Sequence, residues 1–177
     1  MPRERDESAI AIVCFDLGGV LVRLRNSWTE VCRAAGLDIR GNADQDRAQQ
    51  ALHEAMAPYV LGRISHVEWA AKSAGALGGL YSEEELSRIH DQWILGEYKG
   101  IAGVIDDIHA AGFATACLSN TNHAHWERML RTDEYPGVSR LGARYASHIL
   151  GLSKPNEAIY RAFEQATGQA SERVLFD

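Results

Sequence analysis

Short apolar runs alternate along the chain with longer segments whose apolar residues have helical spacing. The runs cover Ile10 to Phe15, Phe113 to Leu118 and Val174 to Phe176. Each has the length of a strand and is almost wholly apolar, which is typical of strands buried on both faces of a parallel sheet. Helical patterns separate the runs, so the sequence predicts an α/β fold with a mainly parallel sheet covered by helices.

A long helical region follows the first strand where a simple βα unit would have a short crossover. Capping boxes begin at Ser65 and Ser82, and residues 44–59 carry apolar side chains at helical spacing. These patterns predict a helical cap over residues 26–96, inserted into a discontinuous core formed by residues 9–25 and 97–177. The chain shows no internal repeat.

The second half of the chain predicts the rest of the core. Gly112 marks a turn between a helix and the second apolar run. The expected elements, in order, are a helix over 101–111, a helix over 122–131, a loop through 135–137, a short strand over 146–150 and a helix over 155–167.

Polar residues follow each of the three apolar runs. Asp16 ends the first and opens a turn with Gly18 and Gly19, Ser119 and Asn120 end the second, and Asp177 ends the third. Taken singly, each has an ordinary structural interpretation as a turn residue, a helix cap or a chain end. In parallel sheets, however, ligands gather at the carboxyl ends of the strands. The sequence therefore predicts one functional site at that edge.

The order of these residues resembles the haloacid dehalogenase-like (HAD) hydrolase superfamily. Its motifs are a strand-end Asp, a strand-end Ser or Thr, a Lys before a helix and a strand-end acidic pair, and here Asp16, Ser119, Lys154 and Asp177 occupy those places. Residues 118–122, 134–136 and 154–160 look most like the branch of glucose-1-phosphatase-type sugar phosphatases and the amino-terminal phosphatase domain of soluble epoxide hydrolases. The resemblance implies a Rossmann-like core with an inserted helical cap.

The resemblance also implies roles for single residues. Asp16 is expected as the nucleophile that forms an aspartyl-phosphate, with Ser119 and the Lys154 ammonium stabilising the charge. The substrate would contact Gly18, Gly19, Asn120 and His123. Mg²⁺, which prefers oxygen ligands, would be held by the Asp16 carboxylate, the Gly18 carbonyl and Asp177.

Two departures from the family pattern bear on activity. Gly18 stands where most phosphatases of the family carry a second Asp that protonates the leaving group, although the similar sugar phosphatases also have Gly there. The fourth motif shows only the first of its two acids, because the sequence stops at Asp177. A sheet that ends on this strand would expose apolar surface, so we expect the natural chain to continue.

Three functions follow as hypotheses. The leading one is a Mg²⁺-dependent phosphatase that hydrolyses a small phosphorylated metabolite, with sugar phosphates among the candidates. The second is a 2-haloacid dehalogenase, which attacks carbon without a metal, but such enzymes usually have Tyr and Thr where this chain has Gly18 and Val20. The third is a catalytically idle protein that binds a phosphorylated ligand or a partner, if the chain truly ends at Asp177.

Composition limits the partners. The net charge of −6 and the absence of a basic cluster argue against nucleic acid, and no apolar run has the length of a membrane span. We expect a cytoplasmic protein whose partner is a small phosphorylated substrate; the sequence leaves its oligomeric state open. The three cysteines lack the spacing of a disulfide framework or a zinc site. Cys14 and Cys117 are expected as reduced neighbours in one layer of the sheet.

Histidines and tryptophans supply the remaining candidates. His123 or His125 lies close enough to Ser119 to replace the missing acid at neutral pH, with His148 a weaker candidate. The expected exposed cap residues are His53, His66 and His90. The four tryptophans are expected in packing, with one cap aromatic facing a ring of the substrate.

Overall fold

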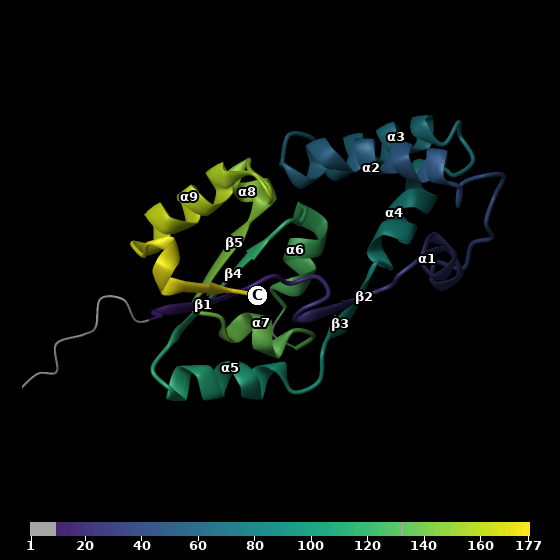
Figure 1. Cartoon of the computed structure of the whole chain (residues 1–177). Coiled ribbons are helices and arrows are strands. Elements are labelled where there is room, and N and C mark those ends of the chain that lie inside the picture. Colours follow the sequence, from purple (N-terminus) through teal and green to yellow (C-terminus); the bar gives the residue numbers. More distant parts are fainter. Residues whose placement is uncertain (1–9, 132) are drawn as a thin grey trace, which may run out of the picture.

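A parallel sheet forms the centre of the structure, a computed structural model that describes residues 10–131 and 133–177 (Figure 1). Residues 9 and 132 of the expected core therefore lie outside the described residues. The four strands are arranged in the order β5-β4-β1-β6, and every neighbouring pair is parallel. They are β1 (Ile12–Phe15), β4 (Ala114–Ser119), β5 (Ala143–Ala146) and β6 (Val174–Phe176). The predicted α/β class with a mainly parallel sheet is confirmed.

Helices cover both faces of this sheet (Figure 1). On one face, Phe15 and Cys117 pack with residues of α5 (Ile101–Ala110), α6 (His123–Met129) and α7 (Pro136–Arg140). On the other, Cys14 and Leu118 pack against Phe163 of α9 (Glu157–Thr167). Burial on both faces explains why the strands are apolar throughout.

The expected placement of the two cysteines in one layer is wrong. β1 and β4 are adjacent as predicted, but Cys14 pairs with Ala116, and Cys117 pairs with Phe15. Neighbouring positions along a strand point to opposite faces, so the two thiols lie on opposite sides of the sheet. The cause is that β4 runs one residue further than β1 before its polar end. Both cysteines are buried and free.

A helical unit follows β2 (Val22–Leu24) and returns through β3 (Ile94–Glu97). Its helices are α1 (Trp28–Ala34), α2 (Asp46–Val60), α3 (His66–Ala76) and α4 (Glu83–Asp91), and they lie to one side of the sheet in Figure 1. Both predicted capping boxes, at Ser65 and Ser82, are present. β2 and β3 form a separate antiparallel pair, which the sequence analysis did not predict.

Two local predictions are wrong. The strand expected over 146–150 lies at Ala143–Ala146, and residues Ser147–Leu150 form the short helix α8. Gly151 ends this helix with a φ of 68°, a conformation that favours glycine. The expected loop through Tyr135 to Gly137 is the start of α7. Its first amide groups are bound by Glu97, whose carboxylate accepts from the N–H groups of Gly137 and Val138.

A last short element, η1 (Ser171–Arg173), is a 3-10 turn that leads into β6. Within residues 10–131 and 133–177, no helix combines the length and the apolar character needed to cross a bilayer.

Candidate active site

Asp16 stands at the carboxyl end of β1, where the chain leaves the sheet. Its Oδ1 atom accepts a hydrogen bond from the Leu17 N–H at 2.6 Å. Its own backbone N–H donates to the carbonyl of Asp177 at 3.0 Å, and the Asp177 N–H donates to the carbonyl of Cys14. The ends of β1 and β6 therefore hold two carboxylate-bearing residues on adjacent strands.

The turn after Asp16 is closed by backbone hydrogen bonds. Gly19 has a φ of 83°, and its N–H donates to the carbonyl of Val22 while the Val22 N–H donates to the carbonyl of Leu17. The N–H of Gly19, expected to bind phosphate, is thus occupied within the turn. These bonds leave out the backbone groups of Gly18, which stay candidates for ligand contacts.

Lys154 forms an ion pair with Asp16, with 3.0 Å between its Nζ and Oδ2 of the carboxylate. The two side chains are 21% and 34% exposed, so the pair opens to solvent. Asn120 fixes the backbone of Lys154 at two points: its Nδ2 donates to the Lys154 carbonyl, and its Oδ1 accepts from the Lys154 N–H, both at 2.8 Å. Asn120, expected at the substrate, therefore also positions Lys154; its contact with substrate stays a prediction.

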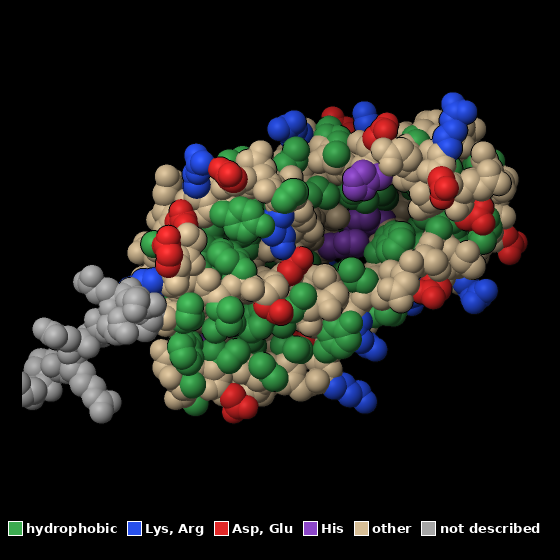
Figure 2. Space-filling view, viewed as in Figure 1, with side chains coloured by type: hydrophobic (Ala, Val, Ile, Leu, Met, Phe, Trp, Pro, Cys, Tyr) green, Lys and Arg blue, Asp and Glu red, His purple; other side chains and the backbone are tan. Residues whose placement is uncertain are grey.

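Ser119 is the last residue of β4 and is only 3% exposed. It lines a cavity of about 260 Å³ together with Gly18, Asn120 and Asn122. His90 and Met56 of the helical unit line the same cavity. The hollow between the sheet edge and the helical unit is visible in Figure 2, where histidine side chains lie inside it.

The expected Mg²⁺ ligands can be tested against the donor set that the structure brings together. Among residues 10–131 and 133–177, no group of three or more His, Cys, Asp or Glu side chains is arranged to hold a metal. Mg²⁺, however, is usually bound through one or two carboxylates together with waters and substrate phosphate oxygens. Asp16 and Asp177, at adjacent strand ends joined by backbone hydrogen bonds, supply carboxylates that fit that requirement, and Gly18 follows Asp16 by two residues.

A cluster of aromatic rings joins the helical unit to the sheet. It consists of Tyr59, His66, Trp69, His90 and His125, hereafter the histidine cluster. The rings of His90 and His125 are stacked with centroids 3.8 Å apart, and Tyr59 stacks on Trp69 at 5.6 Å. His125 Nε2 donates to the carbonyl of His90 at 2.9 Å. The contact therefore spans α4 and α6, two helices on either side of the cavity.

Asn122 completes the cluster from the end of β4. Its Oδ1 caps α6 by accepting from the His125 N–H, and its Nδ2 donates to His90 Nε2 at 3.1 Å. Burial lowers the pKa of His90. Burial, and then the neighbouring His90, lower the pKa of His125 to about 3. Both imidazoles are therefore neutral near pH 7.

These positions correct several expectations about histidines. His90 is 1% exposed and His66 is half-buried, so only His53 of the three is an exposed residue of the helical region. His125 does not suit the role of the missing general acid. Its lowered pKa leaves the imidazole neutral near pH 7, so it lacks the extra proton that an acid would donate. His123 is exposed at the start of α6, with its ring 6.1 Å from that of His148.

Several contacts of the site were absent from the sequence analysis. The buried Ser147 hydroxyl lies 2.7 Å from the Val60 carbonyl of α2 and accepts from the Thr121 N–H, which ties the helical unit to the loop after β4. Asn122 could have been recognised as a helix cap from its place before α6. Ser147 and His90 offered no comparable signal, because their partners lie far away in the sequence.

The architecture and the acid–lysine pair at the sheet edge define a hydrolase of the haloacid dehalogenase-like type. The family model of haloacid dehalogenase-like hydrolases matches residues 10–176 of this chain. The protein belongs to that family, as the resemblance implied; the branch within it stays a prediction.

Solved structures of the family share this fold. A HAD family enzyme of Bacteroides thetaiotaomicron is 19% identical with a TM-score of 0.76, over 95% of this chain and 83% of that chain, and the same enzyme has been solved with magnesium and inorganic phosphate. A predicted HAD-like hydrolase of Porphyromonas gingivalis is 22% identical with a TM-score of 0.74, over 94% and 80% of the two chains. The L-2-haloacid dehalogenase of Xanthobacter autotrophicus, solved with chloropropionic acid covalently bound, is 18% identical with a TM-score of 0.60, over 94% and 69%.

We expect the histidine cluster to make stability depend on pH. The pKa of His125 is about 3 in the folded chain, against about 6.5 when unfolded, so the unfolded state takes up the proton first as the pH falls. This contribution is fully present above pH 6.5 and is lost progressively toward pH 3. Between pH 6.5 and 5, His125 should cost about 2 kcal/mol of unfolding free energy.

Urea unfolding at several pH values would measure this effect. His125→Gln should flatten the loss of stability on acidification, whereas His53→Gln, at an exposed position, should retain it. Equal pH dependence in wild type and His125→Gln would show that the cluster does not stay neutral in the folded chain.

Proposed function

We propose that the protein is a Mg²⁺-dependent phosphatase that hydrolyses a small phosphate monoester through an aspartyl-phosphate. The observation that carries the proposal is the half-buried Asp16 carboxylate, paired with the Lys154 ammonium at 3.0 Å on the carboxyl edge of the sheet. A carboxylate in this position is a suitable nucleophile for phosphorus. We also propose that the helical unit serves as a cap over this edge, within residues 26–96.

In the first step an oxygen of Asp16 attacks phosphorus, and the bond from phosphorus to the ester oxygen breaks. The Leu17 N–H holds Oδ1, and Lys154 lies at Oδ2, so the carboxylate is oriented before the substrate arrives. Lys154 also offsets the repulsion between two anions, because its ammonium lies beside the attacking group. Ser119 would donate its hydroxyl proton to a phosphate oxygen.

In the second step water attacks the phosphorus of the aspartyl-phosphate, which releases inorganic phosphate and regenerates the Asp16 carboxylate. Asp16, Asp177 and the Gly18 carbonyl would hold Mg²⁺, which supplies positive charge next to the transferring phosphoryl group. Two backbone hydrogen bonds join Asp177 to β1 at the end that carries Asp16, which supports this proposal. The magnesium and phosphate complex of the Bacteroides thetaiotaomicron enzyme supports the proposal by analogy of fold.

A 2-haloacid dehalogenase is the second candidate. The covalent complex of the Xanthobacter autotrophicus dehalogenase shares the fold and favours it. A carboxylate at Asp177 suits both candidates, because it could hold Mg²⁺ or activate the water that hydrolyses an ester intermediate. Gly18 and Val20, however, differ from the Tyr and Thr usual in dehalogenases.

Asp16→Asn should abolish turnover while the chain stays folded, because the amide cannot attack phosphorus. We expect kcat to fall roughly 100-fold or more. Phosphate and halide release would be measured with and without EDTA, and Asp107→Asn on the exposed face of α5 is the matched control. Phosphate release that EDTA stops supports the phosphatase. Halide release that survives EDTA would support the dehalogenase, and release of neither would indicate an idle binding protein.

Substitutions at Lys154 and Asn120 should distinguish the effect of the Lys154 charge from the effect of its position. Lys154→Met removes the ammonium and should lower kcat/KM about 100-fold, the scale of one preorganised electrostatic group. Asn120→Ala frees the backbone of Lys154 and should cost about 10-fold. Asn120→Asp retains the bond from the Lys154 N–H and should recover part of that loss. Lys72→Met, on an exposed part of α3, is the control and should leave kcat/KM unchanged. If kcat/KM of Lys154→Met were also unchanged, Lys154 would not belong to the site.

Gly18→Asp tests the missing acid. Without a proton donor, the rate should depend steeply on the basicity of the leaving group. The new carboxyl group should reduce that dependence. The backbone of Gly18 lacks the positive φ of Gly19. An added Cβ would lie 3.1 Å from the Leu24 side chain, which must shift slightly to admit it. A series of phosphate esters of graded leaving-group pKa would measure the slope. A flat dependence in the wild type would mean that another group supplies the proton.

A further inference from the structure

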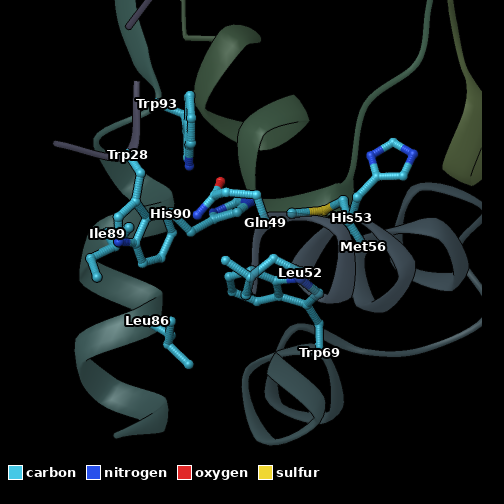
Figure 3. Close-up of a pocket in the computed structure, with 10 residues that line it drawn as sticks. All are labelled: Trp28, Gln49, Leu52, His53, Met56, Trp69, Leu86, Ile89, His90 and Trp93. Atoms are coloured by element: carbon cyan, nitrogen blue, oxygen red, sulfur yellow. The ribbon is translucent and has the colours of Figure 1, made fainter. Parts of the chain in front are cut away.

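A second cavity of about 240 Å³ lies inside the helical unit. Figure 3 shows side chains from α1 and α4 facing those from α2 and α3 across it. Most of its surface comes from apolar side chains, among them Trp28, Leu52, Met56, Trp69, Ile89 and Trp93. Indole faces are flat and rigid, and they favour contact with other rings.

Few charged or strongly polar side chains line the cavity. Among the described residues, the side chains that line it include no Lys, Arg, Asp or Glu. His90, which lies at its inner end, is neutral near pH 7 because burial lowers its pKa. Gln49, His53 and His90 are the polar side chains among its lining residues. A group with many hydroxyls, such as a sugar, would exchange most of its hydrogen bonds to water for contact with apolar side chains, and that transfer is unfavourable.

This cavity adjoins the one at the sheet edge. Met56, His90 and Trp93 line both, and the cavity at the edge is also lined by Gly18 and Ser119, next to the Asp16 carboxylate. A ligand whose phosphate lies at Asp16 would therefore reach the apolar cavity past the side chains of His90 and Trp93.

We propose that the substrate is the phosphate monoester of an alcohol that carries an aromatic ring, with the ring bound in the cavity of the helical unit. The inference rests on the proposed function. Among phosphate monoesters it favours those of aromatic alcohols over sugar phosphates. The size is adequate, because apolar cavities of about 150 Å³ bind benzene, and this one has about 240 Å³.

The test compares two esters with similar leaving groups, 3-phenylpropyl phosphate and glycerol 3-phosphate. Both leave as primary alcohols, so their ratio of kcat/KM reports the contribution of the ring. Burial of one ring should raise kcat/KM by a factor of roughly 30 or more. Acetyl phosphate, a small and reactive third substrate, measures phosphatase activity independently of the ring.

Two changes at Leu52, a half-buried residue of α2, should reduce that ratio. Leu52→Asn places an amide in the cavity, and Leu52→Trp fills it while keeping it apolar, so the pair guards against a variant that does not fold. We expect either to lower the ratio about 10-fold. Val67→Asn on α3, at a side chain that is 68% exposed, is the control and should retain the wild-type ratio.

The outcomes separate the inference from the proposed function. Phosphate release from acetyl phosphate without a preference for the phenylpropyl ester would overturn the inference and leave the phosphatase standing. A preference that both folded Leu52 variants retain would also overturn it, because the ring would then bind elsewhere. Phosphate release from none of the three compounds would overturn both.

Discussion

The parallel register of β1 between β4 and β6 is the constraint on which the site depends. Pairing of Phe15 with Cys117 and of Cys14 with Phe176 brings three strand ends to one edge of the sheet. Asp16, Ser119 and Asp177 are then neighbours although they are far apart in the sequence. A shift of one residue in either pairing would displace one of these ends along the strand direction by about 3.3 Å.

The two sides of the hollow differ in charge. The sheet edge holds a carboxylate and an ammonium in contact, open enough to admit a charged group. The histidine cluster opposite stays uncharged, because burial keeps the imidazole of His125 deprotonated down to a pKa of about 3. Such a division suits a ligand with one anionic end and one apolar end.

Much of the fold and part of the site could be predicted from the sequence. The apolar runs and the capping boxes at Ser65 and Ser82 are local signals, and the structure agrees with them. β2, β3 and the start of α7 carry no such signal. They form because of distant partners, such as Glu97 binding the first N–H groups of α7.

The sequence indicated which residues would form the candidate site, but it did not indicate most of the contacts that these residues make. Lys154 lies against Asp16 as its place in the motif order suggested. Asn120 was assigned to the substrate, yet its amide is bound to the backbone of Lys154. His90 was expected to be exposed, because no sequence pattern reveals that Asn122 and His125 would enclose it.

The short antiparallel pair of β2 and β3 brings together the two ends of the helical unit, which is therefore an insertion into the core. Leu24 at the exit lies opposite Ile94 at the return, so the chain leaves and re-enters the core at one point. The length of chain between them is therefore not fixed by the geometry of the sheet. Helices could be added, lost or rearranged there while the acid at Asp16 keeps its place. In the proposed function, the sheet edge performs the chemistry and the helical unit is the part that can vary with the ligand.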